Sequence, residues 1–318
     1  MSVSVRYQSD RRRISEVRPR RGGACVSGPA VGMHYYPSGA HFRPKKFFWP
    51  ETLAGRLLLR RASPQARIVL NPRKHKGTLV LHEAELPGNI DALIRKAIAA
   101  ENNIKVIAYT VIPVTETGLR RISELVLEKY SKSDLLPTVA MILKELALNA
   151  AKANFKRILF EMRRLDLEND ADYERGMRDF KAAISEQWAI EYGRRSKQLN
   201  RRVEILFSYN AERLLINVVN NFPLSQKEEI RVRQKLAAAM QYEDIGDFFA
   251  NCGDETEGAG LGLVLIMTAL KSYGIDPHAF TIYVNAKDQT VASLEVPLSS
   301  SYQIRRHRLP HITQQEKT

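Results

Sequence analysis

The sequence has too few cysteines to support a disulfide framework. Only Cys25 and Cys252 occur among 318 residues, whereas disulfide-stapled secreted domains carry about four or more. No export signal is expected either, because no apolar segment follows the N-terminal arginines. The seven histidines have no cysteine pairs beside them, which excludes the usual zinc-binding spacings. Together these absences predict a reducing, cytoplasmic setting.

Long hydrophobic runs are absent as well. The most apolar stretch, residues 261–270, is about half as long as the ~18–20 residues that a membrane helix needs. We therefore expect a core helix there and no association with a membrane. A hydrophobic content of 44% and a charged content of 26% are ordinary for a soluble protein.

Positive charge is concentrated at the N-terminus. Residues 1–65 hold 13 Lys and Arg against 3 Asp and Glu, out of a net charge of +14 for the whole chain. This segment is rich in Arg, Gly, Ser and Pro, which favours a solvated, disordered tail. The alternative is an arm that binds nucleic acid, since aromatic and basic side chains alternate over residues 34–49.

From residue 67 onward the pattern becomes regular and predicts an α+β fold. Residues 66–131 form either a small α/β accessory module or an extension of the main domain. The expected elements there are paired strands at 67–70 and 78–81, a helix at 89–100, a strand at 106–111 and a helix at 117–130.

The main domain is expected at residues 132–298, followed by a C-terminal tail at 299–318. Ser225 and Glu228 have the spacing of a capping box at a helix start. The expected elements are a helix at 134–154, a strand at 157–162, a helical insertion at about 166–200, a hairpin of 202–209 and 213–219, a helix at 226–240, a loop at 244–257, a helix after the following glycines, and a hairpin of 280–284 and 290–296.

Three polar residues share one face of the helix expected at 134–154. Glu145, Asn149 and Lys152 are spaced by four and three residues, so they form a row along that face. An amide oxygen is a suitable Mg²⁺ ligand, a lysine neutralises phosphate, and a carboxylate can polarise water or a hydroxyl. The alternative is the solvated polar edge of an amphipathic helix.

Closely spaced glycines occur at positions 258, 260 and 262. Glycine lets the backbone approach anionic oxygens, and the helix that follows offers its N-terminus to phosphate. The spacing matches neither the dinucleotide-binding fingerprint nor the Walker A loop. On its own, such a segment is equally consistent with a flexible turn.

Together, in this order, the two segments resemble the GHKL superfamily, which includes gyrase and the histidine kinases. Residues 145–152 are similar to its asparagine box, and residues 257–263 to the lid-side glycine box of the histidine-kinase branch. The resemblance covers about residues 134–298. It implies a Bergerat α/β sandwich, a mixed sheet with helices on one face, that binds ATP with Mg²⁺.

The resemblance also implies roles for individual residues. Asn149 would coordinate Mg²⁺, Lys152 would contact phosphate, and Glu145 would be the candidate base. Thr290 lies where the family has a polar residue near the adenine. The residues expected to wrap the triphosphate are Gly258, Ala259, Gly260, Leu261 and Gly262.

The sequence departs from the family pattern at residues 220–224. The family has Asp-x-Gly-x-Gly there, whereas this chain has Asn220 for the aspartate and no glycine. An asparagine accepts and also donates hydrogen bonds, so a guanine nucleotide becomes conceivable beside adenine. Phe222 is expected to fill part of the pocket or to stack in it.

Three functions follow from these patterns. The leading one is a Mg-nucleotide-binding protein that acts as a protein kinase in trans or as a nucleotide-dependent signalling switch. The helices expected at 117–130 and 134–154 carry no acceptor histidine, which argues against phosphorylation in cis. A signalling protein is the expected partner, and a homodimer is left open. The alternatives are an inactive interaction module with a degenerate pocket, whose partner surface is the insertion, and nucleic-acid binding through residues 1–65.

Overall fold

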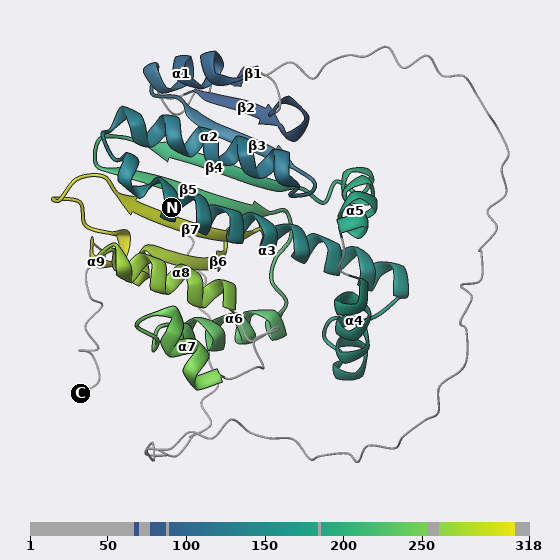
Figure 1. The fold of residues 1–318 in the computed structure, drawn as a ribbon. Helices are drawn as coiled ribbons and strands as arrows, with labels where there is room; N and C mark the ends of the chain where they lie inside the picture. The colour runs from purple at the N-terminus through teal and green to yellow at the C-terminus, as the bar shows by residue number, and fades with distance from the viewer. Residues whose placement is uncertain (1–66, 70–76, 87–88, 184–185, 253–260, 309–318) are drawn as a thin grey trace, which may run out of the picture. The chain divides into compact units, whose positions relative to one another are not determined.

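Seven strands form one mixed sheet in the computed structural model, which describes residues 67–69, 77–86, 89–183, 186–252 and 261–308. The strand order is β1-β2-β3-β4-β5-β7-β6 (Figure 1). Only β2 and β3 run parallel, and every other neighbouring pair is antiparallel. The strands are β1 Arg67–Val69, β2 Thr78–His82, β3 Asn103–Ala108, β4 Val203–Tyr209, β5 Arg213–Asn220, β6 Phe280–Val284 and β7 Thr290–Pro297.

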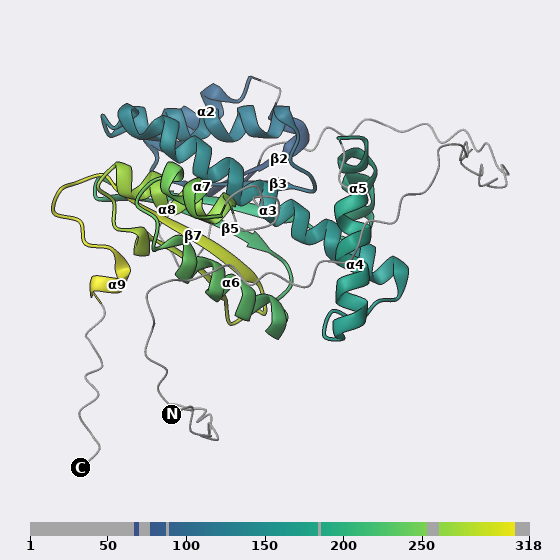
Figure 2. The ribbon, with the colours of Figure 1, turned by 60° about the horizontal axis from the view of Figure 1, so that its bottom comes forward.

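Helices cover the buried face of the sheet. Residues of β4 and β5 alternate between buried and partly exposed positions, as expected for strands with one face in a core. Figures 1 and 2 show α1, α2, α3 and α8 on that face. The helices are α1 Asp91–Ala99, α2 Pro113–Lys129, α3 Leu136–Arg163, α4 Asp170–Ala183, α5 Glu186–Gln198, α6 Gln226–Ala239, α7 Ile245–Cys252, α8 Leu261–Ser272 and α9 Arg305–Arg308.

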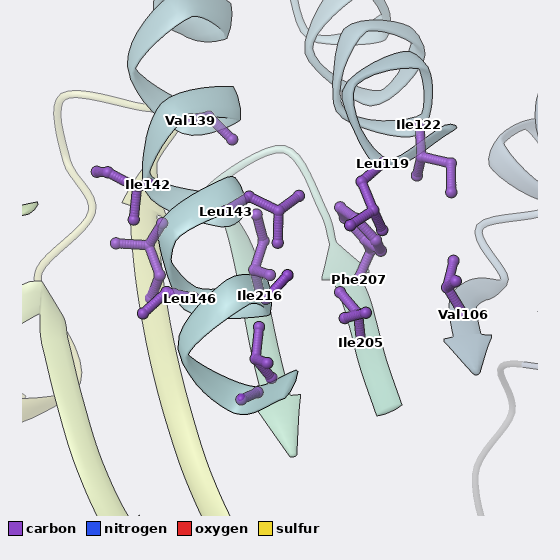
Figure 3. Packing of buried hydrophobic residues seen from close by; sticks show 14 of the residues in the cluster. Val106, Leu119, Ile122, Val139, Ile142, Leu143, Leu146, Ile205, Phe207 and Ile216 are labelled. Atoms are coloured by element: carbon purple, nitrogen blue, oxygen red, sulfur yellow. The ribbon is translucent and has the colours of Figure 1, made fainter. Parts of the chain in front are cut away.

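A single hydrophobic core connects both halves of the predicted domain organisation. In Figure 3, α3 places Ile142, Leu143 and Leu146 near Ile216 of β5, while α2 lies over β3 and β4. These residues belong to one buried cluster, which also contains Leu79 and Leu81 of β2. Strands β2 and β3 therefore belong to the same sheet and the same core as the elements that follow residue 132.

Helix α3 is longer than expected, and the strand predicted at 157–162 is wrong. The helix continues through that segment to Arg163. Phe155, Ile158 and Leu159 are buried at helical spacing, and neither Gly nor Pro interrupts the run. A short apolar run of this kind cannot be assigned by periodicity alone. The helix ends where Arg164 adopts a left-handed conformation, with φ of 54°.

The segment after α3 is helical, as predicted for the insertion at about 166–200. Helices α4 and α5 lie beside the C-terminal part of α3 (Figure 2). Tyr173, Gly176 and Phe180 form the buried side of α4. The insertion therefore adds a wall beside the second half of α3.

The loop predicted at 244–257 is partly wrong, because α7 occupies its first half. Asp244 accepts a hydrogen bond from the backbone N–H of Asp247 at 2.8 Å, which satisfies a donor in the first turn. The buried Phe248 packs edge-on against Tyr242. Asp and Gly residues at 244–247 are typical of loops, and for this reason the sequence predicted a loop where the short helix α7 begins.

The remaining expected elements agree with the structure within a few residues. Ser225 and Glu228 make the predicted capping box at the start of α6. Both predicted hairpins form, as β4–β5 and β6–β7. Within the described ranges, none of the helices has the length and apolar character needed to cross a bilayer.

Candidate functional site

A cavity of about 1350 Å³ lies between α3, α4, α6, the start of α8 and the sheet. Four predicted site residues, which come from three separate segments of the chain, line it: Asn149, Lys152, Asn220 and Thr290. Its floor is apolar, with Val218 of β5, Ile282 of β6 and Ala292 of β7. A few polar groups that converge over an apolar floor are typical of a small-molecule site.

The helix motif and the glycine segment meet at one end of this cavity. Gly262 is the second residue of α8. A Cβ atom added to Gly262 would lie 2.8 Å from Oε2 of Glu145 and 3.5 Å from Nδ2 of Asn149. A Cβ at this position would displace the Glu145 carboxylate, so glycine lets α8 approach the polar row of α3 without that shift. Two motifs more than 100 residues apart in the sequence are therefore in contact.

The polar row of α3 is open to ligand. Asn149 and Lys152 are exposed and Glu145 is half-buried. Within the described part of the chain, none of these three side chains makes a hydrogen bond or an ion pair. Leu261 begins α8 and is half-buried, whereas Gly258, Ala259 and Gly260 lie outside the described residues.

The Asn220 side chain, in contrast, is already hydrogen-bonded within the protein. Its side chain is buried, and its Nδ2 donates to the backbone carbonyl of Ala150 and to Oδ1 of Asn154, both at 2.9 Å. Asn154 in turn donates to the carbonyl of Arg201 at 3.1 Å. An amide nitrogen has two hydrogens, and both are engaged here. Asn220 therefore has only its carbonyl oxygen left, which can accept but not donate.

Thr290 is the neighbour of Asn220 across the sheet. The two residues are paired in the register of β5 and β7. The hydroxyl and the backbone N–H of Thr290 both donate to the carbonyl of Phe222 at 2.9 Å. These bonds hold the segment after β5 against the start of β7. Thr290 thus lies in the cavity wall beside Asn220.

Phe222 does not line the cavity, so the expectation that it fills or stacks in the pocket is wrong. Its ring is buried, and two guanidinium groups contact it, that of Arg157 at 4.9 Å and that of Arg201 at 5.6 Å from the ring centroid. Cation–π contacts of this kind stabilise the ring where it lies. Leu224 lines the cavity instead.

Glu228 binds two cations of α3 at the border of the cavity. It forms ion pairs with Lys156 and Arg157, and its side chain is only 8% exposed. Burial pushes the pKa of Glu228 up, but the charges of Lys156 and Arg157, together with hydrogen bonds from Lys156 and the Ser225 backbone, hold it below its usual value. Glu228 is therefore ionised at neutral pH and neutralises part of the local positive charge.

Sequence reasoning missed a group of basic residues that line the same cavity. Lys156 continues the row of Asn149 and Lys152 by one further turn, so helical periodicity could have found it. The others come from α4 and α6, and nothing in the sequence indicates that these helices face one another. The missed residues are Lys156, Arg178, Lys181, Arg231 and Lys235.

Acidic metal ligands are not gathered in the described part of the chain, where no group of three His, Cys, Asp or Glu side chains could hold a metal ion. Mg²⁺ commonly has only one or two protein ligands and takes its others from phosphate and water. Asn149 alone is compatible with that mode of binding.

Comparison with known proteins identifies a relative without assigned activity. An uncharacterized protein of Treponema pallidum (strain Nichols) is 30% identical over 216 residues, which cover 68% of this chain and 42% of that protein. The chain thus spans about two fifths of the relative's length. No protein-family model matches the chain, and no solved structure does so either.

Proposed function

We propose that this protein binds ATP with Mg²⁺ in the cavity between α3 and the sheet, in the manner of the histidine-kinase branch of the GHKL superfamily. The observation that carries the proposal is the contact of Gly262 with Glu145 and Asn149. Chance resemblance of two short motifs would not require them to meet in space. A nucleotide site built from both motifs does require it.

The residues at this end of the cavity fit a magnesium triphosphate. Asn149 would hold the metal through its amide oxygen, and Lys152 would contact a phosphate. The start of α8 beside them adds backbone N–H groups and the positive end of a helix dipole. Bound Mg²⁺ would supply neutralisation of phosphate charge. Glu145 is close enough to Asn149 and Gly262 to orient an acceptor hydroxyl or water.

The hydrogen bonds of Asn220 favour adenine over guanine. Adenine presents an exocyclic amine, which needs an acceptor, whereas guanine presents a carbonyl oxygen, which needs a donor. Both hydrogens of the Asn220 amide are held by Ala150 and Asn154. The remaining carbonyl oxygen matches the adenine amine.

Transfer of phosphate to a second protein and switching by nucleotide binding both use this site. The packed segment after β5 favours a second candidate function, an interaction module that binds nucleotide without turnover. Phe222 and Leu224 replace the family's glycines there, and Phe222 is fixed between Arg157 and Arg201. Measurement of ADP release by the purified chain with Mg-ATP distinguishes a turning-over enzyme from a binding module.

Isothermal titration calorimetry with Mg-ATP and Mg-GTP tests the site assignment. We expect measurable binding of Mg-ATP, weaker binding of Mg-GTP, and a loss of about 100-fold in Mg-ATP affinity in Asn149→Ala, which is roughly 2.8 kcal/mol. Gln234→Ala is the control, because Gln234 is an exposed residue of α6 outside the cavity wall. An unchanged Mg-ATP affinity in Asn149→Ala would falsify the assignment.

A further inference from the structure

Positive charge dominates the cavity wall away from Gly262. Three helices contribute to this wall, α3 with one cation, α4 with two and α6 with two. The cations are Lys156, Arg178, Lys181, Arg231 and Lys235, and the acidic residues among the described lining residues are Glu174 and Glu228. Such an excess of one sign around a cavity attracts anions.

Local acidic groups neutralise only part of this charge. Glu228 is engaged by Lys156 and by Arg157. The pKa of Lys235 is lowered by burial and further by the charges of Arg231, Lys181 and Lys156. The positive charges of Arg231, Lys181 and Lys156 therefore lie close enough to Lys235 to disfavour its charged form. An anion placed among them would relieve that repulsion.

Tyr173 gives the wall a fixed geometry. Its ring is buried, and the guanidinium of Arg231 lies 4.0 Å from the ring centroid. The ammonium of Lys156 lies 5.9 Å from the same centroid. Stacking on an aromatic ring limits the conformational freedom of an arginine. Arg231 is therefore held ready for a ligand across the gap between α4 and α6.

The basic wall is separate from the end that is proposed to bind the triphosphate. Lys156 lies seven residues beyond Asn149 on α3, a distance of about 10 Å along the helix axis. The cavity volume of about 1350 Å³ also exceeds the roughly 300–1,000 Å³ of ordinary small-molecule sites. The cavity has room for a nucleotide and for a further anionic group.

We propose that the basic wall formed by α4 and α6 is a second anion subsite, which binds a phosphate group other than those of the triphosphate. That phosphate is either part of the nucleotide, attached to its ribose, or a separate phosphate or pyrophosphate bound beside it. The inference rests on the proposed function in one respect, since the phosphate is called second relative to a nucleotide bound at the other end of the cavity. The subsite itself is supported by the group of basic residues in the wall.

Calorimetry with three probes tests the subsite: Mg-ATP, adenosine 3′,5′-bisphosphate and inorganic pyrophosphate, at constant ionic strength. In the double variant Arg178→Gln/Lys181→Gln we expect the phosphate probe that uses the subsite to bind about tenfold more weakly, which is roughly 1.4 kcal/mol. The affinity for Mg-ATP should change by less than about threefold, which is roughly 0.7 kcal/mol. Both side chains are exposed, so their replacement leaves the core intact. Arg175→Gln is the matched control, an exposed arginine of α4 that does not line the cavity.

The two phosphate probes separate the sources of the second phosphate. Pyrophosphate binding that survives saturation with Mg-ATP and weakens in the double variant identifies a separate phosphate. Weakening confined to the bisphosphate identifies a ribose phosphate. Equal affinities of wild type and double variant for both probes overturn the subsite, and so does an equal loss in Arg175→Gln, which reveals a general charge effect.

Failure of the proposed function gives a different result. If the wild type binds no Mg-ATP but binds pyrophosphate in a manner that depends on Arg178 and Lys181, the nucleotide assignment fails and the anion subsite stands. The variant Asn149→Ala adds a cross-check, since it is expected to weaken Mg-ATP and to leave pyrophosphate binding unchanged.

Discussion

The two ends of the cavity differ in how their polar side chains are engaged. At one end, Glu145, Asn149 and Lys152 make no hydrogen bond or ion pair within the described residues, and Glu145 and Asn149 lie against the start of α8. At the other, Asn220 and Thr290 are joined to the surrounding backbone by short hydrogen bonds. The first end has residues of the asparagine box of the proposed family, whereas at the second end Asn220 stands where that family has an aspartate.

This difference gives the residues after β5 a structural role. Phe222 contacts the guanidinium groups of Arg157 and Arg201, and Asn220 is hydrogen-bonded to α3. The side chains of Glu145, Asn149 and Lys152 at the first end make no such contacts among the described residues. We infer that substitutions at the second end change stability, whereas substitutions at the first end change ligand binding.

The largest effect on stability is expected at Glu228, the buried acidic residue at the border of the cavity. Glu228→Gln leaves Lys156 and Arg157 without their buried counter-charge, which costs about 3–5 kcal/mol. Urea unfolding at neutral pH measures this change. The control is Glu229→Gln, which removes a partly exposed pair with Arg233 and is expected to cost less than about 1 kcal/mol.

The same variant has a predictable pH dependence. The pKa of Glu228 is held below its usual value in the folded protein, so the stabilisation is present above the unfolded pKa of about 4.3 and is lost as pH falls through the folded value. The difference between wild type and Glu228→Gln should therefore shrink as pH drops below about 4. A constant difference across this range would show that packing, and not charge, causes the effect.

The next largest effect is expected when Asn220 is replaced by aspartate, the residue that the proposed family has at this position. Asn220→Asp places a carboxylate oxygen against the carbonyl of Ala150 and Oδ1 of Asn154, where an amide nitrogen now donates. We expect a loss of about 1–3 kcal/mol in the free energy of unfolding, the usual cost of unsatisfied buried polar groups. Thermal or urea denaturation measures it.

Asn149→Asp is the matched control, because it makes the same chemical change at the first end. Asn149 is exposed and forms no bond that the change would break, so its stability should change by less than about 0.5 kcal/mol. Equal losses in the two variants would remove the distinction between the ends of the cavity.

Much of the fold was predictable because its signals are local. Alternating strands, the hairpins and the Ser225–Glu228 capping box can all be recognised within a dozen residues. The strand predicted at 157–162 was wrong because the short apolar run at Ile158 and Leu159 is compatible with the period of a strand as well as that of a helix. The structure also shows that β3 pairs with β4 across about 100 residues, a pairing that no local pattern specifies.

The part of the candidate site that could be predicted is the part whose residues share one face of a single helix, α3. Glu145, Asn149 and Lys152 belong to one face, and the same spacing extends to Lys156. The basic residues of α4 and α6 could not be assigned, since their approach depends on how α4 packs on α3 through Tyr173 and Phe180. The network of Asn220 is likewise tertiary, because its partners lie 66 and 70 residues away.

The smallest effect on stability, with a clear effect on ligand, is expected at Gly262. In Gly262→Ala the new Cβ must displace Oε2 of Glu145, which is the far end of a flexible side chain without hydrogen-bond partners in the described residues. Alanine also favours a helix over glycine by up to about 1 kcal/mol. We therefore expect the free energy of unfolding to stay within about 0.5 kcal/mol of wild type. We expect a lower affinity for Mg-ATP, measured by calorimetry, and slower release of ADP.

Gly176→Ala sharpens this comparison, since it makes the same change on α4. Its Cβ would meet the ring of Phe160, which is almost fully buried and cannot move aside. Overpacking of this kind typically costs about 1–3 kcal/mol. A Gly262→Ala protein as destabilised as Gly176→Ala would mean that Glu145 is fixed by packing. The contrast between an open end of the cavity and a closed one would then be wrong.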